Sequence, residues 1–113
     1  LAAAWIRRAV DDSRRRLQVD VLDLYQAHWP DPATPIAETL AAFGALLAAG
    51  TVRAIGASNL DDAQLAEALR VADAEGLPRW ATLQPEYNLY DRAGFDGPLR
   101  ARCRREGIGV ICY

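Results

Sequence analysis

Apolar residues recur with a helical period in some segments of the chain and in short unbroken runs in others. One helical face is indicated by four residues spaced by four, three and four positions: Ile36, Leu40, Phe43 and Leu47. The run from Val21 to His28 is too short for a helix by itself and indicates a strand. The alternation continues along the chain. We expect helices over residues 2–17, 35–49, 60–75 and 98–106, and strands over residues 21–28, 51–58, 80–88 and 109–113.

Local signals support several of the expected helix ends. Thr34 stands as an N-cap before Pro35, and Glu38 falls in the first turn, where a negative charge is favourable. Three helices are followed by a glycine that can adopt the left-handed conformation of a helix end: Gly50, Gly76 and Gly107. Two further apolar faces are expected to point inward, and they carry Ile6, Val10 and Leu17, and Leu65, Leu69 and Ala72.

The alternation of strands and helices predicts the fold class. Strands separated by helices pair in parallel, because an antiparallel pair would need only a short turn between them. The chain is therefore predicted to be α/β, a series of strand–helix units. An open doubly wound sheet and a closed barrel both fit this pattern. The missing glycine-rich turn after any strand counts against a dinucleotide-binding sheet of the open kind.

Polar residues fall at the C-terminal end of every expected strand. They are His28, Ser58 with Asn59, Gln84 and Tyr113, and the strand ends are 30, 26 and 29 residues apart. In a parallel α/β barrel these ends share one rim, where active sites are built. Each residue also has a structural interpretation: a histidine bonded to a carbonyl, a cap for the next helix, a loop contact and a packed aromatic ring. Their common phase favours a shared site.

Charge and cysteine content exclude several classes of function. The net charge is −2, and all thirteen basic residues are arginines, most of them spread over the expected helices, so nucleic-acid binding has little support. The Arg14–Arg16 run is interpreted as the solvated face of an amphipathic helix. Cys103 and Cys112 have no metal-binding or redox spacing, so no metal and a cytoplasmic location are expected. No segment is apolar enough to cross a bilayer.

Four strings of the sequence resemble those of the aldo-keto reductases in order, spacing and chemistry. They are DVLDLYQAHWP at residues 20–30, GTVRAIGASN at 50–59, LQPEYN at 83–88 and GIGVICY at 107–113. The resemblance implies that residues 1–113 form a single partial domain of a (β/α)8 TIM barrel, from about strand 4 to strand 7. It also implies that the N-terminal and C-terminal parts of the barrel are missing from the chain.

The resemblance further implies a role for each strand-end residue. His28 would be catalytic, forming a hydrogen bond to the carbonyl of an aldehyde or ketone substrate, and Trp29 would line the substrate pocket. The cofactor would be NADP(H). Its nicotinamide carboxamide, which has both a donor and an acceptor, would be bound by Ser58, Asn59 and Gln84, with Tyr113 stacked on the ring. Hydride transfer from the cofactor would reduce the substrate to an alcohol.

The sequence also departs from the pattern of a complete enzyme. The family's proton donor is a tyrosine assisted by a lysine and an aspartate on earlier strands, and this chain has no lysine. None of its own four tyrosines is expected to replace that donor. We therefore expect a fragment that is catalytically incomplete alone and has open sheet edges. The alternative is a non-catalytic accessory or regulatory protein on the same scaffold. The oligomeric state is not predicted.

Overall fold

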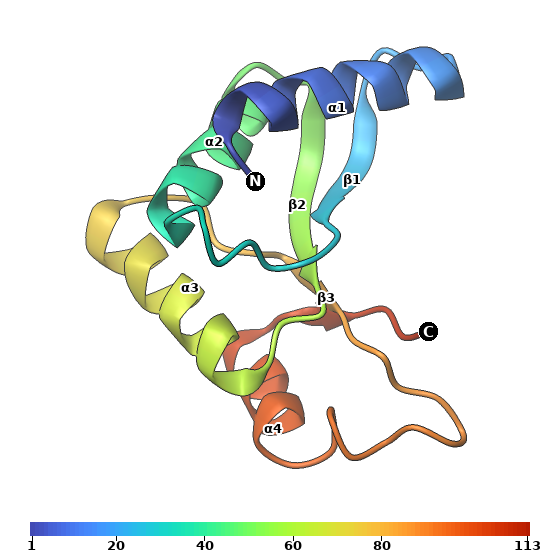
Figure 1. The fold of residues 1–113 in the computed structure, drawn as a ribbon, viewed down its shortest axis with the longest axis vertical. Coiled ribbons are helices and arrows are strands. Elements are labelled where there is room, and N and C mark those ends of the chain that lie inside the picture. The colour runs from blue at the N-terminus through green and yellow to red at the C-terminus, as the bar shows by residue number, and fades with distance from the viewer.

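Helices and strands alternate along the whole chain in the computed structural model, which describes residues 1–113 (Figure 1). The helices are α1 (Ala3–Leu17), α2 (Ile36–Ala48), α3 (Asp62–Glu75) and α4 (Pro98–Glu106). The strands are β1 (Leu22–Ala27), β2 (Val52–Ser58), β3 (Thr82–Gln84) and β4 (Gly109–Val110). They form one parallel sheet in the order β1-β2-β3-β4. The predicted parallel α/β fold is confirmed.

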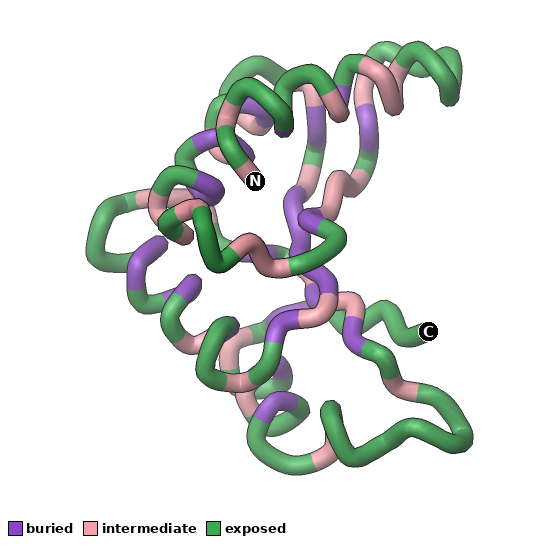
Figure 2. Tube along the Cα trace, in the orientation of Figure 1, coloured by how far each residue is buried: buried purple, intermediate pink, exposed green.

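The hydrophobic core lies between the sheet and the helices. Figure 1 shows the helices following one another along one side of the sheet, and Figure 2 shows buried residues on the strands and on parts of the helices. Every second strand residue points to this side, so Ile55, Ala57 and Leu83 are almost fully buried. The edge of Phe43 packs on Trp80 with ring centroids 5.1 Å apart. The opposite face of the sheet carries polar side chains, among them Gln26 and Gln84, toward the C-terminal ends of the strands.

Most of the predicted helix faces and ends are confirmed. Gly50, Gly76 and Gly107 all have positive φ, between 64° and 69°. Leu65, Leu69 and Ala72 are buried, as are Leu40 and Phe43. Two details of the prediction are wrong. Leu17, the last residue of α1, is 64% exposed, and only Ile6 and Val10 of that helix are buried. Helix α2 begins after Pro35, because the Thr34 hydroxyl donates to Asp31 instead of capping the helix.

The two C-terminal strands are shorter than predicted. β3 ends at Gln84 because Pro85 has no N–H with which to continue the ladder, so the prediction of a strand to residue 88 is wrong. β4 covers only two residues, but parallel hydrogen bonding continues beyond it. The N–H groups of Ile111 and Tyr113 donate to the carbonyls of Leu83 and Pro85 over 3.1 and 3.4 Å. This pairing carries Tyr113 to the end of β3.

On the face of the sheet opposite the helices, one row of residues crosses all four strands in register. Gln26 is aligned with Gly56, Gly56 with Thr82, and Thr82 with Gly109. A Cβ atom on Gly56 would lie 2.0 Å from the Thr82 Oγ1 and 2.9 Å from the Gln26 Oε1. The absence of a side chain at Gly56 therefore lets Gln26 reach across β2 to Thr82.

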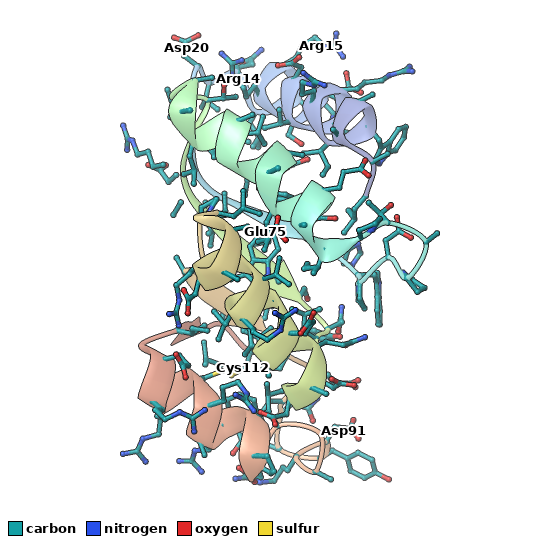
Figure 3. All side chains as sticks on the ribbon, turned by 90° about the vertical axis from the view of Figure 1, so that its left-hand side faces the viewer. Arg14, Arg15, Asp20, Glu75, Asp91 and Cys112 are labelled. Atoms are coloured by element: carbon teal, nitrogen blue, oxygen red, sulfur yellow. The ribbon has the colours of Figure 1, made fainter.

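The arginine run lies at one end of the molecule. Figure 3 shows Arg14, Arg15 and Asp20 close together there. Arg14 and Arg15 form ion pairs with Asp11 and Asp12 one turn earlier in α1. This arrangement agrees with the interpretation of the run as the solvated face of an amphipathic helix. None of the four helices is both long and apolar enough to span a membrane.

Gly56 and Gly109 lie in the row that also contains Gln26 and Thr82, and their substitution is expected to have unequal effects. Gly56→Ala should lower the free energy of unfolding by about 1–3 kcal/mol, since the added methyl group overlaps Thr82. Gly109→Ala is the matched control, because its Cβ would meet its nearest neighbours at an ordinary 3.6 Å. Urea unfolding of both variants measures the difference. Equal stability of the two would contradict the close approach at Gly56.

Candidate functional site

The C-terminal ends of all four strands open into one hollow of 510 Å³. Its lining contains all six residues predicted for the site and one further side chain: His28, Trp29, Ser58, Asn59, Gln84 and Tyr113, with Gln26. These residues are up to 87 positions apart in the sequence, and parallel pairing brings them to the same edge of the sheet. The structure therefore brings the predicted residues together.

The hydroxyl and amides of the hollow form a connected hydrogen-bond network. The Ser58 hydroxyl donates to the Gln84 backbone carbonyl over 2.7 Å, and the Asn59 N–H donates to the same oxygen over 3.1 Å. The Asn59 side-chain Nδ2 donates to the His28 carbonyl over 2.9 Å and to the Ser58 Oγ over 3.2 Å. These bonds join β1, β2 and β3 at the rim and restrict where each group can move.

Tyr113 closes this network from the end of the chain. Its hydroxyl donates to the Asn59 Oδ1 over 2.6 Å. Its backbone carbonyl accepts a hydrogen bond of 2.9 Å from the N–H of Tyr87, in the loop after β3. Tyr113 stays 48% exposed and lines the hollow, so its ring is accessible to a flat partner.

Asn59 has an unusual backbone conformation, with φ of +59°. Asparagine tolerates this left-handed conformation better than most residues. The turn directs the Asn59 side chain back toward β1, whereas the next helix is capped by another residue. The Asp61 carboxylate accepts from the Gln64 N–H, and the Gln64 Oε1 accepts from the Asp61 N–H, in a capping box. The interpretation of Asn59 as the cap of α3 is therefore wrong.

His28 and Trp29 follow β1 directly and remain exposed at the mouth of the hollow. Their ring centroids are 6.0 Å apart. The His28 imidazole makes no hydrogen bond within the chain, so the interpretation of a histidine satisfied by a neighbouring carbonyl does not hold. Both ring nitrogens are available to an outside group.

Gln26 is the lining residue that the sequence interpretation missed. It lies one layer below the rim, on the same face of β1 as His28, because side chains two residues apart share a face. Its Nε2 donates to the Gln84 Oε1 over 2.6 Å, and its Oε1 accepts from the Thr82 hydroxyl over 2.8 Å. The available signal was a polar residue inside an apolar strand, two positions before His28.

The other tyrosines and the cysteines lie outside this hollow. Tyr25 points to the opposite face, where its ring centroid is 5.9 Å from that of Phe43, and burial raises the pKa of its phenol. A proton donor needs the opposite change, so this position does not suit a catalytic tyrosine. Cys103 is buried on α4 and Cys112 is exposed, and both are free. No three His, Cys, Asp or Glu side chains are grouped as metal ligands.

A second hollow of 530 Å³ lies beside the loop after β1 and extends to α3. It shares Trp29 and Ser58 with the first, but apolar residues make up half of its lining. The indole Nε1 of Trp80, in its wall, is buried and has no partner. The first hollow is the stronger candidate for chemistry, because polar or aromatic groups from every strand end converge only there.

Comparisons with known proteins identify the family of the chain. The family model described as "Aldo/keto reductase family" matches residues 1–113. The chain is 45% identical over 89 residues, 79% of its length, to the aldo-keto reductase YhdN of Bacillus subtilis. It is 38% identical over its whole length to the NADH-specific methylglyoxal reductase of Escherichia coli. The chain spans 25% and 33% of the lengths of these two relatives.

Two solved structures have the same backbone fold as the chain. The glycerol dehydrogenase AKR11B4 of Gluconobacter oxydans matches 99% of the chain with a TM-score of 0.87 and 35% identity. A thermostable aldo-keto reductase, Tm1743, matches all of it with a TM-score of 0.88 and 33% identity. The chain corresponds to 32% and 40% of those two chains. Because the family model extends over every residue and the backbone follows these structures, the chain belongs to the aldo/keto reductase family.

Proposed function

We propose that this chain supplies the nicotinamide site and one catalytic histidine of an oxidoreductase that reduces aldehydes or ketones. The observation that carries the proposal is the hollow at the strand ends, where a histidine, a hydroxyl, two amides and a tyrosine ring meet. Family membership supports the class of reaction. The cofactor supplies the hydride, and the residues of the chain bind, orient and polarise.

The groups on the floor of the hollow suit a carboxamide. Asn59 has its Nδ2 engaged by the His28 carbonyl, so its Oδ1, which already accepts from Tyr113, faces the hollow as an acceptor. The Gln84 Nε2 has no partner within the chain and can donate. One acceptor and one donor match the amide and carbonyl of a nicotinamide carboxamide. The exposed face of Tyr113 would hold the flat ring, so that Ser58, Asn59, Gln84 and Tyr113 together fix its orientation.

The mouth of the hollow suits a carbonyl substrate. The free imidazole of His28 can donate a hydrogen bond to a carbonyl oxygen, which stabilises negative charge as it develops there. Trp29 would provide an apolar wall beside it, since its side chain is 59% exposed on the same rim. No lysine occurs in the chain to lower the pKa of a tyrosine. We therefore propose that His28 orients the substrate and that the main proton donor lies outside residues 1–113.

The proposal also includes a cofactor and a cellular location. NADP(H) is the cofactor that we propose, by resemblance to the family, although one relative is by name specific for NADH. Titration with both reduced dinucleotides decides between them. A cytoplasmic location is proposed because both cysteines are free thiols.

Replacement of His28 is expected to affect turnover far more than cofactor binding. In the protein as naturally expressed, His28→Ala should lower kcat for a simple aromatic aldehyde by about 100-fold or more, because the donor to the carbonyl oxygen is lost. The dissociation constant of the reduced cofactor should change by less than about threefold, a difference smaller than one typical hydrogen bond. Steady-state kinetics and fluorescence titration measure the two quantities.

His28→Gln is the matched control, since its amide keeps an N–H donor near the same place. It should retain more activity than His28→Ala. Unchanged turnover in His28→Ala would overturn the catalytic assignment. Cofactor binding without any turnover in the unsubstituted protein would instead favour the accessory function.

Replacement of Asn59 by glycine and by alanine separates the two roles of this residue. Both changes remove the amide and should weaken cofactor binding about tenfold, the value of roughly one buried hydrogen bond. Both changes also remove the side chain that bonds the His28 carbonyl and the Tyr113 hydroxyl, so both should lower the free energy of unfolding. Asn59→Ala should lower it by about 1 kcal/mol more than Asn59→Gly, because φ is +59°. Fluorescence titration and urea unfolding measure these effects. Full cofactor affinity in Asn59→Gly would exclude the amide from the site.

A further inference from the structure

We propose that Gln26 is a positioning residue that turns the side-chain amide of Gln84 so that its NH2 group, and not its oxygen, faces the ligand. The inference rests on the proposed nicotinamide site and adds a determinant of its specificity. Gln26 itself lies below the rim and acts on the ligand through Gln84. The hydroxyl of Thr82 orients the Gln26 amide, and the absence of a side chain at Gly56 leaves room for it.

A chain of hydrogen bonds runs in one direction from Thr82 through Gln26 to Gln84. The Thr82 hydroxyl donates to the Gln26 Oε1 over 2.8 Å, and the Gln26 Nε2 donates to the Gln84 Oε1 over 2.6 Å. A side-chain amide has a donor end and an acceptor end that are not interchangeable. Because Gln26 occupies the acceptor end of Gln84, the Nε2 of Gln84 is the end left for a ligand.

The backbone of Gln84 is already held in place by hydrogen bonds. Its backbone carbonyl accepts from the Ser58 hydroxyl and from the Asn59 N–H, over 2.7 and 3.1 Å. The remaining freedom lies in the side chain, where rotation of the terminal amide by half a turn would exchange donor and acceptor. Of the hydrogen bonds in the chain, only the one from Gln26 distinguishes these two orientations.

The Gln26 side chain crosses the neighbouring strand β2 to reach its partners. It starts on β1 and reaches residues of β3, which lies two strand spacings away, about 10 Å. The path crosses β2 at Gly56, which is aligned with Gln26 on one side and with Thr82 on the other. A Cβ at Gly56 would stand 2.9 Å from the Gln26 Oε1. The crossing therefore requires glycine at this position.

The consequence is a preference for ligands with a carbonyl oxygen on the ring. An outward NH2 group on Gln84 favours a ring substituent that accepts a hydrogen bond, as the carboxamide of nicotinamide does. The same orientation disfavours a ring with no acceptor, since binding would then remove water from the Gln84 Nε2 and leave it without a hydrogen-bond partner. Gln26 contributes to this discrimination without touching the ligand.

The test uses the protein as naturally expressed and two probes, the oxidised nicotinamide dinucleotide and its pyridine analogue, which lacks the carboxamide. Gln26→Leu keeps a similar volume and removes both hydrogen bonds. It should weaken binding of the nicotinamide form about fivefold to tenfold, about one hydrogen bond, and leave the pyridine analogue almost unchanged. Gln26→Glu can only accept, so it should attract the Gln84 NH2 group inward and weaken the nicotinamide form at least as much.

Thr82 offers a matched pair of variants. Thr82→Val removes the hydroxyl that orients Gln26 and should reproduce part of the loss, whereas Thr82→Ser keeps the hydroxyl and should restore the affinity. Asp23→Asn, an exposed change on β1 far from the hollow, is the control for effects of mutation in this strand. Urea unfolding of every variant measures stability separately, since a purely structural role would lower stability without changing the preference between the two probes.

A double-mutant cycle decides whether Gln26 acts through Gln84. On a Gln84→Leu background, Gln26→Leu should cause no further loss of nicotinamide affinity. Additive losses, or equal losses for both probes, would overturn the inference while leaving the nicotinamide site intact. Failure of the unsubstituted protein to bind the nicotinamide dinucleotide would overturn the proposed function, and this inference with it.

Discussion

Parallel backbone pairing of the four strands is the constraint on which the site depends. A parallel ladder sends all strands in one direction, so every C-terminal end reaches the same edge of the sheet. His28, Ser58, Gln84 and Tyr113 share a hollow for this reason and not because of any attraction between their side chains. The ladder even continues past β4, where the Tyr113 N–H still donates to Pro85. A different pairing order would separate these residues.

Near the C-terminal ends of the strands the two faces of the sheet differ in chemistry, and the helices explain why. Helices that connect parallel strands lie on one side, and they bury Ile55, Ala57 and Leu83 there. The alternation of side chains then sends Gln26, Gly56 and Thr82 to the other side. Burial of the apolar face stabilises the sheet, while the opposite face carries the polar groups of the hollow. Stability and the candidate site thus use different residues of the same strands.

Two backbone features give the hollow its shape. At Asn59 a left-handed turn returns the side chain to the His28 carbonyl and separates it from the helix cap at Asp61. At Gly56 the missing side chain leaves room for Gln26 to contact Thr82 and Gln84. Asn59 departs from ordinary strand and helix geometry, whereas Gly56 keeps strand geometry and lacks only a side chain, and each gives access to a neighbouring strand. Such departures from local preference are typical of functional sites.

The sequence by itself determined the order of helices and strands, the helix ends at Gly50, Gly76 and Gly107, and the phase of the polar strand ends. These are local properties, set by hydrophobic period and by the conformational freedom of glycine. Strand length was less predictable, since Pro85 ends β3 and β4 covers only two residues. Only the tertiary structure decided that Gln26 belongs to the hollow and that Asn59 faces β1. Gln26 does stand out as a polar residue in an apolar strand, but its partners, like those of Asn59, lie on neighbouring strands at separations of 58 and 31 positions, and no local pattern shows which residues those are.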